Sequence, residues 1–264
     1  MSGIRLIVNA DDFGFTRDVN EGIIEAHRNG ILTATTLMAN GAAFDHAVAL
    51  AQDNPSLDIG CHLVIVQGQS VLDPSRALPA TLPDLVWSLL LGQLRVYEEF
   101  AAQVLKIKAA GIRPTHLDTH KHTHLLPPVL RAVERVAREF SIPWVRRPFD
   151  FRTGTGAAAR LMRLRKQGMT SALRGLKSTD HFAGFQLTGI LNQENLIETL
   201  ERLPDGLTEF MCHPGKLGAE LTAAPTRLKQ SRQLELTALT SAAVRQTIAR
   251  RGIVLTGYPA TDSK

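Results

Sequence analysis

Two adjacent carboxylates, Asp11 and Asp12, follow a short apolar segment near the start of the chain. Residues 4–8 are continuously apolar and rich in β-branched side chains, which predicts a buried β-strand, and Gly14 favours a turn soon after it. Adjacent aspartates at the end of a buried strand repel each other and lose solvation, so they require a compensating positive charge. A metal ion bound by one of them would supply that charge and leave the other free for proton transfer. Capping of the following helix by either aspartate is the alternative.

Histidines form the second group of residues that could do chemistry. Four of the nine lie between residues 116 and 124. If residues 115–118 form a strand, alternate side chains point to one side for as long as the chain stays extended. That side would carry His116, Asp118, His120 and His122. Neutral imidazoles and a carboxylate are the usual ligands of a catalytic divalent ion.

Two further histidines lie at the ends of other predicted strands. His62 lies in the segment 57–64, and His213 follows the segment 208–212. With the aspartates and the histidine cluster, four strands end in Asp or His. Because catalytic groups converge at the carboxyl ends of barrel strands, this pattern predicts a metal-dependent hydrolase.

These side chains must be positioned by the alternating strand-like and helix-like segments of the chain. Strands are predicted over residues 4–8, 33–38, 57–64, 115–118, 143–145, 208–212 and 253–256. Helices are predicted over residues 19–29, 44–51, 85–91, 97–110, 127–140, 157–177, 196–203 and 228–250. Repeated β–α units predict an α/β fold with a parallel sheet and outer helices. We therefore expect one domain, residues 1–264, folded as an irregular (β/α) TIM-like barrel, with a doubly wound open sheet as the alternative.

Composition narrows the classes of function. The 264 residues can bury a sizeable core, and 44% hydrophobic and 21% charged residues are ordinary for a globular protein. The net charge of +5 permits an anionic partner, but no nucleic-acid-binding motif accompanies it, so nucleic acid is not an expected partner. Two cysteines are too few for a disulfide framework. With no amino-terminal signal and no membrane-length apolar run, we expect a cytoplasmic enzyme.

A series of motifs resembles that of the YdjC-like carbohydrate deacetylases over nearly the whole chain. The motifs are Asn9-Ala10-Asp11-Asp12-Phe13-Gly14, Gly60-Cys61-His62-Leu63, His116-Leu117-Asp118-Thr119-His120-Lys121-His122-Thr123-His124, Ser178-Thr179-Asp180-His181-Phe182 and Met211-Cys212-His213-Pro214. The family often has Ser where Thr119 stands and a hydrophobic residue where Cys61 stands, and neither position is an expected ligand.

The resemblance implies an irregular (β/α) barrel that removes acetyl groups from N-acetylated sugars with the help of one divalent ion, with Mg or Zn expected. Carried over by position, it implies Asp12, His62 and His120 as metal ligands. It also implies Asp11 as the catalytic base, which would take a proton from water.

Other residues are candidates on chemical grounds. The amine leaves only when protonated, and His213 is the candidate general acid, with orientation of a metal ligand as the alternative role. Asp118 is expected to pair with an imidazole, and His122 and His124 to bind substrate hydroxyls or simply to occupy the loop. The role of His181 stays open. The few aromatic residues that could contact a sugar are Trp87, Tyr97 and Trp144.

Alternative functions and partners follow from other features. Some YdjC-like relatives lie in hopanoid lipid pathways, so a lipid-linked amino sugar is an alternative substrate. A non-catalytic metal-binding or sugar-binding protein is another alternative, although binding alone would not require two aspartates. The segment Arg146 to Lys177 holds nine basic residues and one acid, which suggests peripheral contact with an anionic membrane if it is not an ordinary outer helix. A homodimer is a further option.

Overall fold

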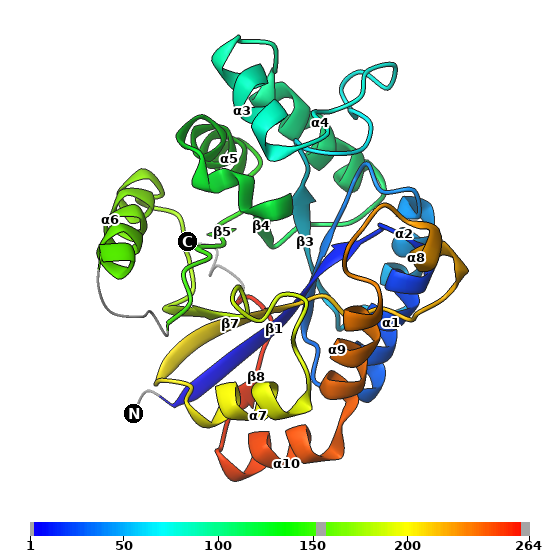
Figure 1. Ribbon diagram of the computed structural model, residues 1–264, viewed down its shortest axis with the longest axis vertical. Helices are drawn as coiled ribbons and strands as arrows, with labels where there is room; N and C mark the ends of the chain where they lie inside the picture. Colours follow the sequence, from blue (N-terminus) through cyan, green and yellow to red (C-terminus); the bar gives the residue numbers. More distant parts are fainter. Residues whose placement is uncertain (1–2, 152–156, 260–264) are drawn as a thin grey trace.

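The computed structural model describes residues 3–151 and 157–259. In this part of the chain, parallel strands form a sheet that curls into an irregular barrel, and helices pack around its outside (Figure 1). The strands are β1 (Ile4–Phe13), β2 (Ala34–Leu37), β3 (Asp58–Leu63), β4 (His116–Thr119), β5 (Trp144–Val145), β6 (His181–Ala183), β7 (Gly206–Cys212) and β8 (Val254–Leu255). Their order in the sheet is β5-β4-β3-β2-β1-β7-β6, and β8 pairs with β1.

The outermost strands of this order, β5 and β6, approach each other through the segments beside them. Isolated parallel bridges join Trp144 to Lys177 and Asp150 to Phe182. The sheet is therefore an irregular barrel and not an open doubly wound sheet, which confirms the predicted fold class. Trp144 Nε1 also donates a hydrogen bond to the Pro259 carbonyl at 3.0 Å, so the end of the described chain returns to β5.

The central strand, β1, is longer than the predicted segment 4–8. It is buried from Leu6 to Phe13, and β7 pairs along one edge as far as Ala10. On the other edge β8 pairs near the start of β1 and β2 pairs from Asn9 onwards. Because β2 still pairs with Phe13, the strand continues through both aspartates where the sequence predicts its end.

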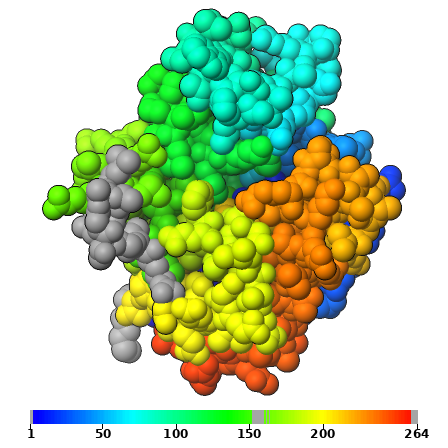
Figure 2. All heavy atoms as spheres, in the orientation of Figure 1, coloured from blue at the N-terminus to red at the C-terminus, as the bar shows by residue number. Residues whose placement is uncertain are grey.

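The helices surround this sheet. They are α1 (Arg17–Asn29), α2 (Phe44–Gln52), α3 (Leu82–Leu90), α4 (Val96–Ala109), α5 (Pro127–Glu139), α6 (Ala157–Ala172), α7 (Gln193–Glu201), α8 (Ala219–Ala223), α9 (Gln230–Thr240) and α10 (Ala242–Arg250), with a 3₁₀ segment, η1 (His120–Leu125), after β4. In the space-filling view, the yellow to red segments that include α7, α9 and α10 form one continuous surface (Figure 2). Within the two described ranges, no helix combines the length and the apolar character that crossing a membrane requires.

The sequence predicts most of these elements and misses a few boundaries. Each predicted strand overlaps an observed one, whereas β6 and α8 have no predicted counterpart. The helix predicted over 228–250 is two helices, because Ser241 has an extended backbone (ψ 137°) and its Oγ accepts a hydrogen bond from the Ala243 N–H. The helix predicted over 157–177 ends at Ala172.

Helix α1 lies against the segment that follows β7, and a glycine makes this contact possible. A Cβ placed on Gly22 would lie 2.4 Å from the Cα of Gly215. No real Cβ tolerates such a distance from backbone, so a larger residue here would push α1 away from the segment that also carries His213.

We therefore expect Gly22→Ala to lower the free energy of unfolding by about 1–3 kcal/mol through overpacking. Gly168→Ala, in the interior of α6, is the matched control because a Cβ there meets nothing within 4 Å. The control should raise the free energy of unfolding by about 0.5–1 kcal/mol through helix propensity. Urea denaturation of both variants measures the difference, and equal effects would contradict the packing explanation.

Candidate metal centre

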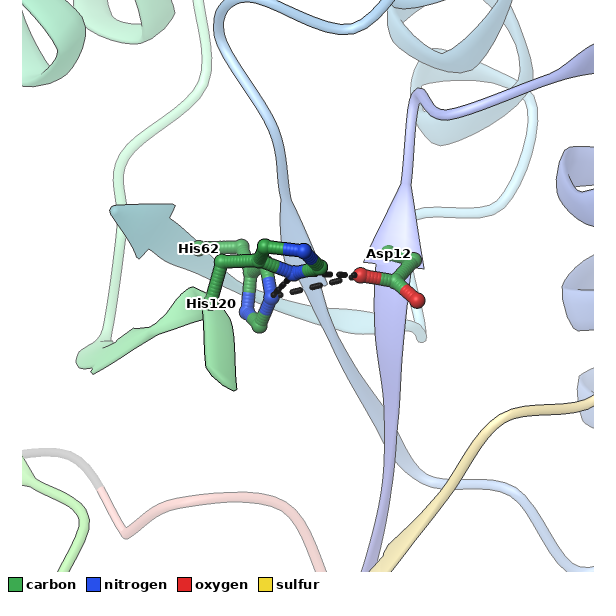
Figure 3. A group of neighbouring side chains, drawn as sticks. All are labelled: Asp12, His62 and His120. Carbon is green, nitrogen blue, oxygen red and sulfur yellow. Dashed lines mark hydrogen bonds and ion pairs between the residues drawn. The ribbon is translucent and has the colours of Figure 1, made fainter. Parts of the chain in front are cut away.

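Three potential metal ligands meet at the carboxyl ends of their strands. Asp12 comes from β1, His62 from β3, and His120 directly follows β4 (Figure 3). Asp12 Oδ1 lies 3.3 Å from His62 Nε2 and 3.3 Å from His120 Nδ1, and the two nitrogens lie 3.2 Å apart. The structure thus brings together the three residues expected as ligands.

An irregularity in β1 explains how adjacent aspartates serve neighbouring sites. In a regular strand, successive side chains point to opposite faces of the sheet. The pairing of β1 with β2 shifts its register between Ala10 and Phe13, and Asp12 adopts a φ of 71°. This bulge lets both carboxylates reach the interior side of the barrel mouth, because an extra residue re-aims the side chains around it.

A neighbouring carboxylate orients the His62 ring. Asp118 Oδ1 lies 2.8 Å from His62 Nδ1, and Thr36 Oγ1 lies 3.2 Å from the same nitrogen. The network holds a proton on Nδ1, so Nε2 is the nitrogen that faces Asp12 and His120. Burial lowers the pKa of His62, but Asp118 and the other nearby aspartates outweigh it and raise this pKa to about 10. The surroundings of His62 therefore strongly favour a positive charge.

The three ligand atoms fit a divalent ion in both geometry and charge. Ligands about 2.0–2.2 Å from a tetrahedral ion lie about 3.3–3.6 Å from one another, close to the separations found here. Asp12 Oδ1 is buried and accepts no hydrogen bond from any described residue. A buried carboxylate oxygen that faces two imidazole nitrogens and accepts no hydrogen bond is placed to bind an ion together with them.

A second possible group, Asp11, His62 and Asp118, fits less well. Arg146 engages both oxygens of Asp11 at 2.7 Å and Asp118 Oδ2 at 2.6 Å. These carboxylates already have a positive partner, so they have less need of an ion. The group containing Asp12 is therefore the better candidate.

Arg146 is the residue of this site that sequence reasoning misplaced. It is only 1% exposed and also donates from Nε to Glu209 Oε1 at 2.6 Å. The expectation of a membrane-facing segment beginning at Arg146 is wrong for this residue, because its side chain is buried and pairs with carboxylates inside the barrel. Its place directly after a predicted strand was the available signal. Membrane contact by the remaining segment stays a prediction.

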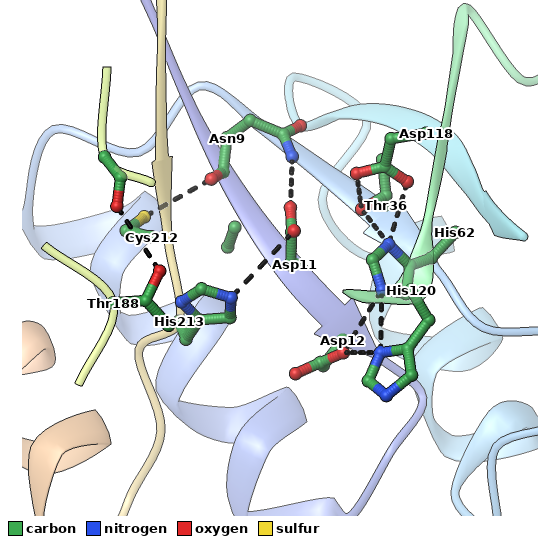
Figure 4. Close-up of polar contacts among 12 residues, drawn as sticks. Asn9, Asp11, Asp12, Thr36, His62, Asp118, His120, Thr188, Cys212 and His213 are labelled. Atoms are coloured by element: carbon green, nitrogen blue, oxygen red, sulfur yellow. Dashed lines mark hydrogen bonds and ion pairs between the residues drawn. The ribbon is translucent and has the colours of Figure 1, made fainter. Parts of the chain in front are cut away.

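Asp11, the expected base, is held as an anion. Burial raises its pKa, but Arg146 outweighs this effect and holds the pKa well below its usual range. Asn9 Nδ2 donates a further hydrogen bond to Oδ1 at 3.1 Å (Figure 4). A carboxylate oxygen has two lone-pair sites, so Asp11 can still accept a hydrogen bond from a water molecule.

Helix α9 contributes two buried residues that no sequence pattern indicates. Arg232 pairs with Asp12 Oδ2, so each aspartate has its own arginine. Glu235, one turn further along, accepts a hydrogen bond from the His213 N–H at 2.5 Å. Burial raises the pKa of Glu235 to about 8. Both contacts depend on how α9 docks against the barrel.

His213 lies on the opposite side of Asp11 from the ligand group (Figure 4). Its Nε2 is 3.9 Å from Asp11 Oδ2, and its Nδ1 is 4.0 Å from Glu235 Oε2. Burial lowers the pKa of His213 to about 4, although the two aspartates oppose this. The resting imidazole is therefore neutral. Its expected role as a general acid stays a prediction.

The remaining histidines of the cluster have different surroundings. The extended backbone ends at Thr119, so alternation applies only to His116 and Asp118, and the chain then turns into η1. His116 lies deeper in the barrel, 3.0 Å from Asn9 Oδ1. His124 is buried between Thr119 Oγ1, at 2.6 Å, and the Arg146 carbonyl, at 3.2 Å, so it cannot reach a substrate hydroxyl.

The three aromatic residues expected to contact a sugar do not line this site. Trp144 is buried against Tyr258, with ring centroids 5.8 Å apart. The Tyr97 hydroxyl donates a hydrogen bond to Glu139, and the guanidinium of Arg135 lies over the Tyr97 ring. Trp87 is exposed on α3. His181 is also outside the site, at the start of β6, with its Nε2 near the Asp205 carbonyl.

The fold and this cluster define an irregular (β/α) barrel with a carboxylate–histidine site at its mouth. A family model described as YdjC-like protein matches residues 5–250. The chain therefore belongs to the YdjC-like family, as its motifs predict.

Individual relatives extend this result. A carbohydrate deacetylase of Brevibacillus brevis is 35% identical over 263 residues, which cover 97% of this chain and 98% of the relative. Among solved structures, an Enterococcus faecalis protein described as a putative cellobiose-phosphate cleavage protein matches with a TM-score of 0.76 and 26% identity, over 97% of this chain and 98% of its own. A lactam utilization protein from Thermus thermophilus shares the fold, with a TM-score of 0.51 and 15% identity over 96% of this chain and 99% of its own.

The buried state of His124 generates a prediction about pH. Burial lowers the pKa of His124 to about 3, whereas an unfolded histidine titrates at about 6.5. Below pH 6.5 the unfolded chain binds a proton that the folded chain does not, so stability falls as the pH drops toward 3. We expect the free energy of unfolding of the wild type, relative to that of His124→Gln, to fall by about 2 kcal/mol between pH 7 and pH 5. Urea denaturation of both proteins at the two pH values measures this difference. A constant difference would contradict a neutral His124.

Proposed function

We propose that this protein is a divalent-metal-dependent hydrolase that removes the acetyl group from an N-acetylated sugar. The observation that carries the proposal is that the two adjacent aspartates have different surroundings. Asp12 Oδ1 faces His62 and His120, whereas the carboxylate of Asp11 is hydrogen-bonded by Arg146. The name of the Brevibacillus brevis relative supports a carbohydrate substrate and a deacetylation reaction.

The reaction needs help on both sides of the amide, because resonance stabilises its carbonyl. A divalent ion, Mg or Zn, held by Asp12, His62 and His120 would polarise the carbonyl and acidify a water molecule. Asp11 stays ionised beside Arg146 and can accept the hydrogen bond of the attacking water. As the new C–O bond forms, Asp11 takes the proton.

The amine nitrogen must gain a proton before the C–N bond breaks. His213 Nε2 lies 3.9 Å from Asp11 Oδ2, which is longer than a hydrogen bond, but such catalytic contacts often tighten when the substrate binds. In that closer arrangement a proton held at Asp11 would pass to the neutral imidazole and from there to the leaving nitrogen. One proton thus moves from water to the amine through Asp11 and His213. The products are the free amino sugar and acetic acid, which releases its proton to give acetate, and both residues return to their starting charge.

The role of each aspartate can be tested separately. Asp11→Asn should lower turnover by about 100-fold or more, because an amide cannot accept the proton, yet it should leave the bound ion in place. Asp12→Asn removes a metal ligand itself. It should therefore weaken metal binding by more than the roughly 10–100-fold that is lost when a residue hydrogen-bonded to a ligand is removed. Acetate release from a panel of N-acetylated sugars, with several divalent ions, measures turnover. Elemental analysis after gel filtration measures the ion.

His181→Ala is the matched control, because this histidine lies at the amino end of β6, whereas the candidate site lies at the carboxyl ends of the strands. The substitution should change neither turnover nor the bound ion. Loss of the ion in Asp11→Asn but not in Asp12→Asn would reverse the two roles. Full turnover in Asp11→Asn would contradict its role as base. Absence of acetate release from every sugar tested, with metal bound, would favour the non-catalytic alternative.

A further inference from the structure

An exposed aromatic ring lies beside the site described above. Phe185 follows β6, and 39% of its surface is exposed. Its ring centroid lies 5.1 Å from that of His122, with the planes tilted by 44°. His122 stands two residues after His120, and β6 neighbours β7, which leads to His213. The pair therefore borders the same mouth of the barrel as the ligand group.

The backbone around Phe185 is held firmly in place. Asp150 accepts hydrogen bonds from the N–H of Phe185, at 3.1 Å, and of Gln186, at 2.9 Å. The preceding Gly184 has a φ of 111°, and a Cβ there would lie 2.3 Å from the Met211 carbonyl oxygen of β7. Only glycine allows this close approach, so the ring is presented from a segment fixed against the barrel.

His122 is also held in an unusual conformation. It has a φ of 52° and Lys121 a φ of 54°, so two consecutive residues with side chains occupy the left-handed region. Such backbone persists only where the surrounding structure fixes it, and it concentrates at functional sites. The Nδ1 of His122 is buried without a hydrogen-bond partner among the described residues. An unpaired lone pair costs less than an unpaired N–H, so the proton belongs on Nε2.

We propose that Phe185 and His122 form a binding site for the pyranose ring of the substrate. An aromatic face packs against the apolar C–H face of a sugar, while a few placed polar groups fix the orientation of its hydroxyls. Phe185 supplies the face, and His122 Nε2–H donates a hydrogen bond to a hydroxyl. The site takes a neutral sugar ring and supplies the aromatic contact that Trp87, Tyr97 and Trp144 do not. This assignment rests on the proposed function.

Sugar binding can be measured without turnover in the Asp11→Asn variant. Arg146 keeps Asp118 and Glu209 as partners there, so the core remains paired. We expect N-acetylglucosamine, titrated by calorimetry or NMR, to bind at least about fivefold more weakly when Phe185→Ala or His122→Ala is added. Phe185→Tyr, which keeps the ring, should restore binding. Ile190→Ala, on the same segment and 65% exposed, should change binding less than about twofold, because it removes no ring or donor.

The outcomes separate the two proposals. Unchanged binding in both Phe185→Ala and His122→Ala, with sugar still bound by the parent, would overturn the pyranose site and leave the proposed function intact. Weaker binding in Phe185→Tyr as well as in Phe185→Ala would also overturn the role of the ring. If the Asp11→Asn parent binds neither N-acetylglucosamine nor any other sugar in a panel of N-acetylated sugars, the proposed function fails. The pyranose site then fails with it.

Discussion

Arg146 pairs with three carboxylates inside the barrel, Asp11, Asp118 and Glu209. Removing one partner from a buried ion pair costs about 3–5 kcal/mol, because it leaves a charge without compensation. Around this guanidinium the site gathers five buried carboxylates and two buried arginines: Asp11, Asp12, Asp118, Glu209 and Glu235, with Arg146 and Arg232. Burial raises the pKa of Glu209 to about 7 and that of Glu235 to about 8, which reduces the excess negative charge. A cation at Asp12 would reduce it further.

The bulge in β1 converts two equivalent aspartates into two different groups. Asp11 has both oxygens engaged by Arg146, so it is an anion with a fixed orientation. Asp12 has one oxygen paired with Arg232, and its other oxygen accepts no hydrogen bond from the described residues. A metal ligand needs such a free oxygen, and a proton acceptor needs a fixed position near the reacting water. The two arginines therefore decide which aspartate can do which task.

Much of the fold and part of the candidate site could be predicted from local sequence. Buried β-branched segments and the helices between them predict a parallel barrel, and the carboxyl ends of parallel strands meet at one mouth. That rule predicts that Asp12, His62 and His120 meet, although they lie at the ends of three separate strands. The break at Ser241 and the length of β1 escaped prediction, because both are set by pairing and packing with distant segments.

The sequence by itself predicted the family and, through the resemblance to it, the candidate ligand group, because the motifs and their order are local features of the chain. Tertiary structure alone decided the residues that set the charges of the site. Arg146 reaches Asp11 across 135 positions of sequence, and Arg232 reaches Asp12 across 220. An arginine on a helix or after a strand is normally solvated, so its burial depends on a carboxylate that the fold brings to it. Phe185 also becomes recognisable only when η1 and β6 lie side by side.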